Sequence, residues 1–150
     1  MALQIHDRSL DQLSPRQLHD IIQLRVDVFV VEQECPYPEL DGRDVEPGTR
    51  HLWLERDGAV VAVARILDDG DVWRIGRVAA ARGSRGLGLA GTLMAAAIEH
   101  CPGRPIVLSA QSHLTEWYGG FGFTPDGAEY LEDGIPHIPM RRDVEPASAS

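Results

Sequence analysis

Apolar residues recur along this chain with two periods, one helical and one extended. After Ser14-Pro15, a pair typical of helix starts, the helical spacing predicts a helix over about 15–32. Extended apolar runs predict strands, and Asp57-Gly58 is the dipeptide of a two-residue hairpin turn between two of them. The strands predicted in this way are 3–6, 51–55, 59–67, 72–80, 106–110 and 135–142, with another extended piece at 122–124.

The most informative stretch runs from Trp73 to His100. It begins as an apolar strand, passes through a cluster of Gly and Arg, and continues as an apolar helical run. The first amides of a helix have no partner within it and carry partial positive charge, so this order suits an anion such as phosphate. Gly86, Gly88 and Gly91 would allow close approach to the backbone, and Arg85 adds a cationic donor. The glycine spacing fits neither the dinucleotide fingerprint nor the nucleoside-triphosphate loop.

The order of elements predicts the fold class. Three strands in a row precede the glycine-rich loop and its helix, and a short helix over 112–119 lies between the last strands. Such a chain is expected to form a mixed sheet with helices on both faces, which is an α+β fold. We expect one domain over 1–144 and a flexible polar tail over 145–150.

Composition narrows the classes of function. The 150 residues carry a net charge of -9, which argues against binding to a nucleic-acid backbone and favours a cationic small molecule. No apolar run approaches the length of a membrane span, so no membrane partner is expected. Cys35 and Cys101 lack the neighbours of a zinc or redox pair, and no metal is expected. Since the first residues show no secretory signal, we expect a cytoplasmic protein with reduced thiols.

A long acidic loop follows the first predicted helix. Residues 35–48 hold several Pro and Gly together with Glu39, Asp41 and Asp44. These carboxylates could attract a cationic ligand. Alternatively, Arg25 and Arg65, which are cations within otherwise apolar elements, could anchor the loop through ion pairs. The sequence leaves both interpretations open.

Several motifs carry a resemblance to a known family. Arg85-x-x-Gly88-x-Ala90 resembles the [Q/R]-x-x-G-x-[G/A] signature of the GNAT acetyltransferases. The phrases L-R-V-D-V-F-V-V-E-Q, W-Y-G-G-F-G-F and D-G-I-P-H-I-P-M-R-R extend the likeness over nearly the whole chain and are similar to the ElaA-type branch of that family. This resemblance implies the GNAT fold, with a central, mostly antiparallel mixed sheet, and transfer of an acetyl group from acetyl-CoA to a primary amine by direct attack.

The same resemblance implies roles for individual positions on the acetyl-CoA side. The strand backbone of Val78, Ala79 and Ala80 would pair with the pantetheine arm. The pyrophosphate would be held by Arg85, Gly86, Leu87, Gly88, Leu89, Ala90 and Gly91. Gln111 stands where many relatives have an Asn that bonds the pantetheine. Tyr118 stands at the position of the Tyr that protonates the departing thiolate, and a phenol suits this task because its proton affinity is similar to that of a thiolate.

The acceptor side is less specified by the sequence. An amine near neutral pH is mostly protonated, so a base must remove a proton directly or through water. His137, Glu32, His51, His113 and the acidic loop are all candidates for this base. The residues expected to bind the acceptor, a small cationic molecule or a peptide amine, are Arg25, Phe29, Glu32, Glu39, Asp41 and His137. The chain could also form a homodimer.

Two alternatives to an acetyltransferase stay open. The chain could be an acyl-CoA sensor or an interaction domain that binds the thioester without turnover. Arg25, Phe29, the run Glu39-x-Asp41-x-x-Asp44 and Arg65 also resemble the N-terminal half of the acyl-homoserine-lactone synthases in order and spacing. That likeness stops near the middle of the chain. In addition, this chain retains the loop that resembles a coenzyme A site.

Overall fold

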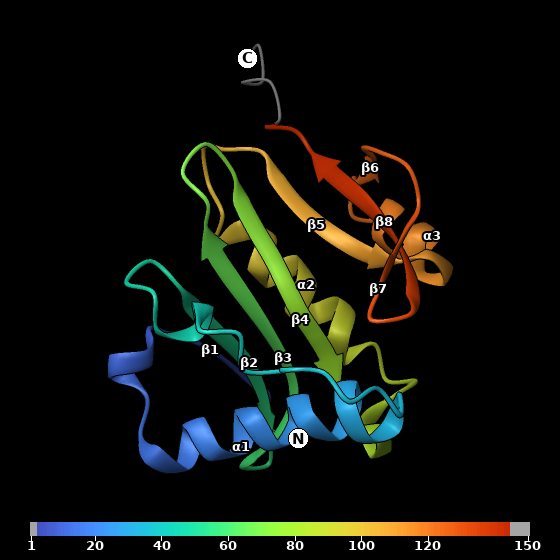
Figure 1. The fold of residues 1–150 in the computed structure, drawn as a ribbon. Helices are drawn as coiled ribbons and strands as arrows, with labels where there is room; N and C mark the ends of the chain where they lie inside the picture. Colours follow the sequence, from blue (N-terminus) through green and yellow to red (C-terminus); the bar gives the residue numbers. More distant parts are fainter. Residues whose placement is uncertain (1–2, 145–150) are drawn as a thin grey trace.

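A computed structural model describes residues 3–144 (Figure 1). The tail predicted over 145–150 lies outside the described residues. The strands are β1 (Leu3–Arg8), β2 (Arg50–Arg56), β3 (Ala59–Asp68), β4 (Trp73–Ala80), β5 (Ile106–Gln111), β6 (Thr124–Pro125), β7 (Tyr130–Glu132) and β8 (Ile135–Arg142). The α-helices are α1 (Pro15–Val26), α2 (Leu89–Glu99) and α3 (Thr115–Gly119).

All of these strands belong to one mixed sheet. Its order is β1-β2-β3-β4-β5-β8-β6, and β7 also pairs with β8. The pair β4–β5 is parallel, whereas the other recorded pairs are antiparallel. The predicted mixed, mostly antiparallel sheet is therefore confirmed.

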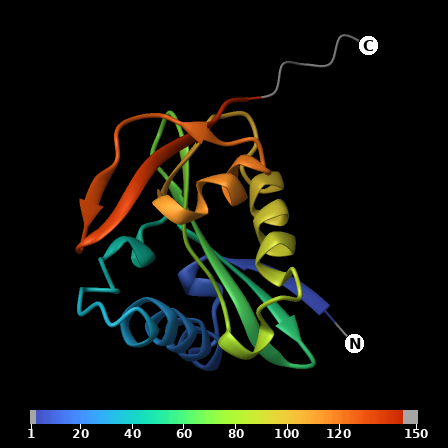
Figure 2. The same ribbon diagram turned by 90° about the vertical axis from the view of Figure 1, so that its right-hand side faces the viewer.

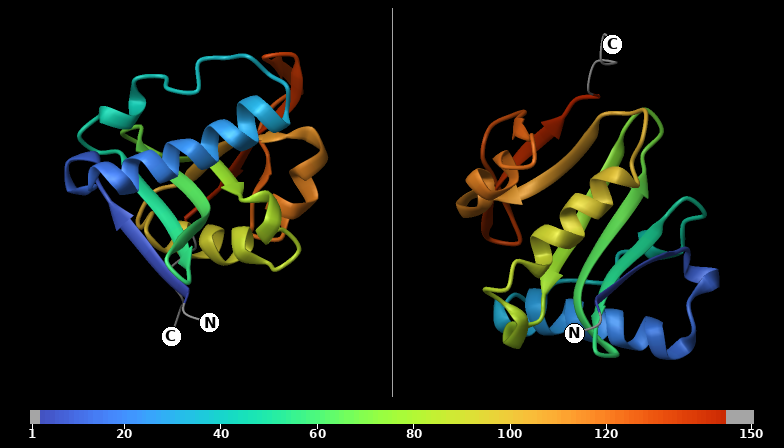
Figure 3. Two further views of the ribbon diagram at one scale, coloured as in Figure 1. Left: turned by 90° about the horizontal axis from the view of Figure 1, so that it is seen from below. Right: turned by 180° about the vertical axis from the view of Figure 1, so that it is seen from behind.

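Helices cover both faces of this sheet. Side chains alternate along each strand, so one strand can contribute to the core on either face. In β2, Leu52 and Leu54 belong to the core that includes Leu93 of α2. Trp53, which lies between them, belongs to the core of the opposite face with Ile21 of α1. Figures 2 and 3 show the two helices on opposite sides of the sheet.

The predicted first helix is present but changes its winding near its end. Ser14 caps α1 by accepting a hydrogen bond from the Gln17 amide at 3.1 Å, and Pro15 occupies the first turn. From Asp27 to Glu32 the helix widens into a π-helical segment. Such segments are often found at functional sites, and this one carries Phe29 and Glu32.

Two Asp-Gly dipeptides form hairpin turns. Asp57 and Gly58 both have positive φ, 52° and 84°, as a type I′ turn between β2 and β3 requires. Asp133 and Gly134 repeat this geometry with φ of 50° and 78° and join β7 to β8. The sequence prediction missed β7, because the strand has only three residues and no apolar alternation to reveal it.

The sheet opens between its two parallel strands. β4 and β5 pair only at their beginnings, through Trp73 with Ile106 and Arg74 with Val107. Further along, β4 contains a bulge against β3, where Arg77 has a φ of +52°. Figure 1 shows the two strands diverging beyond their paired start. This separation leaves a cleft in the middle of the sheet.

Candidate active site

The cleft lies where β4 and β5 separate and has a volume of about 470 Å³. One wall is the stretch of β4 from Arg74 to Val78, and the other includes Leu108, Ser109 and Gln111 of β5. The π-helical segment, the acidic loop and the β7–β8 hairpin complete it. A pocket of this size can enclose a small reactive group together with part of a second molecule.

Tyr118 lies on α3 and faces this cleft. It is 8% exposed, and its ring makes edge contacts with Trp117 and Phe123 at centroid distances of 4.9 and 6.2 Å. Burial raises the pKa of its phenol to about 12. Tyr118 therefore packs with core aromatic residues and also lines the cleft, and its phenol is protonated at neutral pH. Gln111, at the end of β5, lines the same cleft.

The three β4 residues predicted to pair with pantetheine differ in their surroundings. Val78 lines the cleft, whereas Ala79 is buried in the core beneath α1. Ala80 is partly buried and packs beside the core on the α2 side. Among the described residues, β4 has no paired strand on its β5 side beyond Arg74. Its backbone there can accept a ligand that pairs as another strand would.

The glycine-rich loop lies between the end of β4 and the start of α2. Gly86 and Gly88 have φ of +82° and +71°, which glycine adopts without strain. A Cβ at either position would meet no atom within 4 Å, so the space above the loop is open. The first backbone bond of α2 joins the Thr92 amide to the Gly88 carbonyl at 3.0 Å. The amides of 89–91 precede it and have no acceptor in the helix, so these residues fit an anionic group such as a pyrophosphate.

Arg85 was predicted to bind the pyrophosphate and Glu32 to bind the acceptor, but the two side chains contact each other. Both Arg85 Nη atoms donate to the Glu32 carboxylate, with an Nη2–Oε1 distance of 2.6 Å. Arg85 also donates to the Ala80 carbonyl at 3.3 Å. The hydrogen bonds from Arg85 lower the pKa of Glu32. Glu32 is not among the residues that line the cleft, so its carboxylate faces the glycine loop instead.

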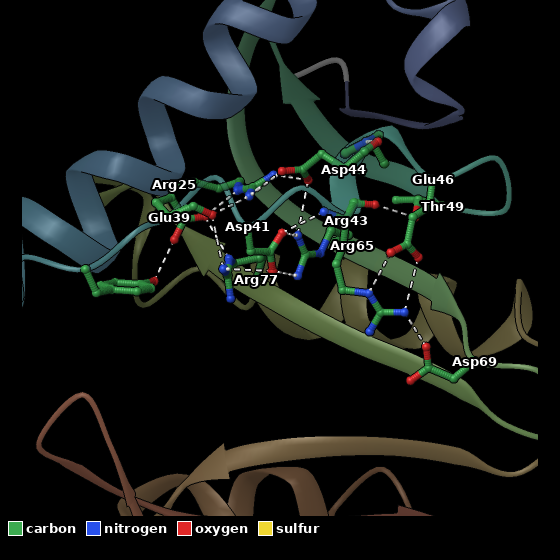
Figure 4. Close-up of polar contacts among 12 residues, drawn as sticks. Arg25, Glu39, Asp41, Arg43, Asp44, Glu46, Thr49, Arg65, Asp69 and Arg77 are labelled. Atoms are coloured by element: carbon green, nitrogen blue, oxygen red, sulfur yellow. Dashed lines mark hydrogen bonds and ion pairs between the residues drawn. The ribbon is translucent and has the colours of Figure 1, made fainter.

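The acidic loop is held by an ion network (Figure 4). Arg25 Nε donates to Glu39 at 2.6 Å, and Arg25 Nη1 donates to Asp44 at 2.8 Å. Arg65 donates to both oxygens of Asp41 at 2.9 Å. The formal charges of the six side chains balance, since this ion network joins three arginines to three carboxylates: Arg25, Arg65, Arg77, Glu39, Asp41 and Asp44.

The ion network corrects two expectations about the acceptor. Arg25 and Glu39 are only 1% and 5% exposed and do not line the cleft. Arg77 also donates to Glu39, with an Nε–Oε2 distance of 2.8 Å. The side chains of Arg25 and Glu39 are too buried and too fully paired to contact an acceptor, so they fix the loop in place. Of the two uses considered for the loop carboxylates, the structure favours anchoring by Arg25 and Arg65.

Three of the residues predicted to bind the acceptor do meet in the cleft: Phe29, Asp41 and His137. Asp41 is held by Arg65 and Arg77, whose hydrogen bonds and charges outweigh the effect of burial and lower its pKa to about 2. His51 lies in the ion network instead, with Nε2 at 3.2 Å from the Asp44 carbonyl, and burial lowers its pKa.

Sequence reasoning missed several residues of the cleft. Tyr130, Glu132 and Asp133 enter it from the β7–β8 hairpin, which Asp133-Gly134 could have revealed. Tyr37 and Arg77 also line it. The position of Arg77 has no sequence signal, since a left-handed bulge is normally predicted from glycine rather than arginine.

Within 3–144, no helix is both long and apolar enough to cross a membrane. Over the same part of the chain, no three His, Cys, Asp or Glu side chains are grouped in a way that could hold a metal ion.

Comparisons with known proteins agree with this geometry. Residues 15–144 match the family model described as an acetyltransferase (GNAT) domain. A UPF0039 protein of Mycobacterium tuberculosis is 48% identical over 135 residues, which cover 87% of this chain and 86% of the relative. ElaA of Escherichia coli is 44% identical over 140 residues, covering 89% of this chain and 92% of ElaA.

Two solved structures extend the likeness to three dimensions. An acyl-CoA N-acyltransferase from Pseudomonas aeruginosa has a TM-score of 0.90 at 42% identity, with 94% of this chain and 99% of that chain covered. The crystal structure of Escherichia coli ElaA has a TM-score of 0.89 at 41% identity, with 95% and 100% covered.

Proposed function

Because this chain belongs to the GNAT acetyltransferase family and is an acyltransferase with the acyl-CoA N-acyltransferase fold, we propose that it transfers an acetyl group from acetyl-CoA to a primary amine. The amine attacks the thioester directly, without an acyl-enzyme intermediate. The acceptor that bears this amine is a small molecule or a peptide.

The separation of β4 from β5 is the observation that carries this proposal. A strand pair that stops after two residues leaves β4 backbone groups free within the sheet, and the 470 Å³ cleft lies there. The pantetheine arm would pair with the backbone around Val78, while Gln111 would contact it from β5. This placement brings the thioester between the two strands, where Tyr118 also faces.

The glycine loop supports the choice of a pyrophosphate-bearing donor. Its open left-handed glycines and the three helical amides without acceptors offer several N–H donors to one anion. Arg85 could add its charge once its bonds to Glu32 are exchanged for bonds to phosphate. Hydrogen bonds to a charged group contribute about 1.5–3 kcal/mol each, so this loop can supply much of the donor affinity.

Tyr118 would supply the proton that the departing sulfur needs. With its pKa raised to about 12, the phenol stays protonated at neutral pH and is available when the thiolate forms. With only 8% of Tyr118 exposed, few positions are left for a competing water. Proton donation of this kind contributes roughly 100-fold or more to a rate.

Release of the coenzyme A thiol from acetyl-CoA, measured against a panel of primary amines, tests the proposal. We expect thiol release that requires an amine, and we expect Tyr118→Phe to lower turnover about 100-fold with unchanged acetyl-CoA affinity. Tyr130→Phe is the comparison variant: it removes another phenol from the same cleft, one that bonds Ser109, and should lower turnover less than Tyr118→Phe does. Binding of acetyl-CoA without any turnover would instead support the sensor alternative.

A further inference from the structure

The proposed transfer leaves one proton without a destination. An ammonium acceptor carries three N–H protons. The amide product keeps one, and one moves to the coenzyme A sulfur through Tyr118. The third proton must leave through a base before the nitrogen lone pair can attack. The cleft should therefore contain a group that can accept a proton near neutral pH.

Most of the groups first considered as this base are occupied. Asp41 and Glu32 are held by arginines that lower their pKa values, which makes both carboxylates weak bases. Glu39 is buried against Arg25 and Arg77. His51 is buried in the ion network, away from the cleft lining. His113 is exposed and does not line the cleft.

His137 differs from these groups in position and in hydrogen bonding. It lies on β8, directly opposite Gln111 of β5 and Tyr130 of β7, and it lines the cleft together with Tyr118. Its Nδ1 lies 2.7 Å from the Ile135 carbonyl. A carbonyl oxygen can only accept, so Nδ1 keeps its proton and donates it there. Nε2 is then the ring atom that can accept a proton.

A route for the proton out of the cleft is also present. His137 Nε2 lies 3.5 Å from Glu132 Oε2, and the Glu132 side chain is 53% exposed. A carboxylate in this position can take the proton from the imidazolium that forms at Nε2 and pass it to solvent.

Resting on the acetyl transfer proposed above, we propose that His137 is the general base of this site and that Glu132 positions it and passes the proton to water. The ammonium proton moves to His137 Nε2, and the freed lone pair forms the new N–C bond as the C–S bond breaks. The sulfur takes the Tyr118 proton, and the tyrosinate is restored by the second proton from nitrogen. The third stays on the amide nitrogen, and the imidazolium passes the first proton to water through Glu132.

Other ionisable groups face His137 from the elements around it. Glu132 and Tyr130 face it from β7, Asp133 enters the cleft from the hairpin turn, and Tyr118 enters it from α3. Across the cleft lie Asp41, the thiol of Cys35 and the phenol of Tyr37. Four arginines also line the cleft: Arg43, Arg65, Arg74 and Arg77.

Replacement of His137 by asparagine tests the assignment. The asparagine amide can still donate to the Ile135 carbonyl as Nδ1 does, but it cannot accept a proton. With acetyl-CoA and the primary amine that the unmodified protein uses best, we expect kcat to fall about 100-fold or more. We also expect the acidic limb of the pH profile of kcat/KM to disappear, while acetyl-CoA affinity measured by calorimetry stays unchanged.

Two control variants and three outcomes decide the matter. His113→Asn removes an imidazole outside the cleft and should change neither kcat nor the pH profile, whereas Glu132→Gln should cause a smaller loss than His137→Asn. An unaltered pH profile in His137→Asn would overturn the assignment, and so would a parallel loss of acetyl-CoA affinity, which marks a structural role. Absence of transfer by the unmodified protein would instead refute the proposed function itself.

Discussion

The acidic loop contacts β4 at the Arg77 bulge, and the glycine loop follows the end of β4 at Ala80. The two loops differ in how their polar groups are paired. In the acidic loop, carboxylates from 39–44 are matched to arginines from α1, β3 and β4 and are largely buried. In the glycine loop, the side chains are small or exposed, and the amides of 89–91 that follow it have no acceptor within α2. Paired charges thus fix a loop in place, whereas backbone donors without an acceptor are available to bind an anion.

Breaking the ion network should produce the largest effect on stability. Arg25→Ala would leave Glu39 and Asp44 buried without their main partner, and removing one member of a buried ion pair costs about 3–5 kcal/mol. Chemical denaturation should show this loss. Arg16→Ala, which removes an exposed arginine from the same helix, should lower the free energy of unfolding by less than about 1 kcal/mol.

Acid should weaken the same ion network. The Asp41 pKa is lowered from 3.8 to about 2, so its contribution to stability is complete above 3.8 and is lost as pH falls toward 2. Because Asp41 is partly exposed, solvent screening should reduce this contribution to about 1 kcal/mol. Denaturation midpoints measured over that window should fall less steeply in Asp41→Asn than in the unmodified protein. Equal slopes would show that Asp41 is not stabilised by Arg65 and Arg77.

The bulge at Arg77 allows its backbone strain to be separated from its ion pairs. Arg77→Ala and Arg77→Gly both remove the bonds to Glu39 and Asp41. Only glycine adopts a φ of +52° without a steric cost, which is about 1–2 kcal/mol for other residues. The glycine variant should therefore be more stable than the alanine variant by about 1 kcal/mol in denaturant titrations, and the reverse order would contradict the left-handed geometry.

The smallest expected effect concerns the contact between Glu32 and the glycine loop. Glu32→Gln should free Arg85 for phosphate and raise coenzyme A affinity by up to about fivefold, since exposed ion pairs are worth at most about 1 kcal/mol. Asp27→Asn removes one negative charge from the same π-helical segment and is the matched control. If both variants bind coenzyme A equally well, the gain reflects net charge rather than the contact with Arg85.

The sequence predicted the elements better than it predicted the contacts between them. The Asp57-Gly58 turn, the first helix and the strand before the glycine loop follow from local rules of turn and helix formation. The pairing of Arg85 with Glu32 joins residues 53 positions apart and depends on how α1 packs on the sheet. Local patterns carry no information about such a distance.

The same limit explains the errors at the candidate site. Arg25 and Glu39 were assigned to the acceptor because the sequence shows their charges but not their burial. The bulge at Arg77 depends on the register between β3 and β4, and Tyr130 enters the cleft through a strand too short to predict. His137 was one candidate base among several, and its hydrogen bond to Ile135 distinguishes it only in three dimensions.

Calorimetric titration with acetyl-CoA tests the central claim most directly, with the unmodified protein compared with Arg85→Glu combined with Gly88→Glu. We expect saturable binding at one site per chain in the unmodified protein. The double variant should lose this binding while keeping a cooperative thermal transition, because both positions are on the exposed loop. Equal affinity in the two proteins, or no binding to the unmodified protein, would contradict the assignment of the glycine loop and the cleft to acyl-CoA.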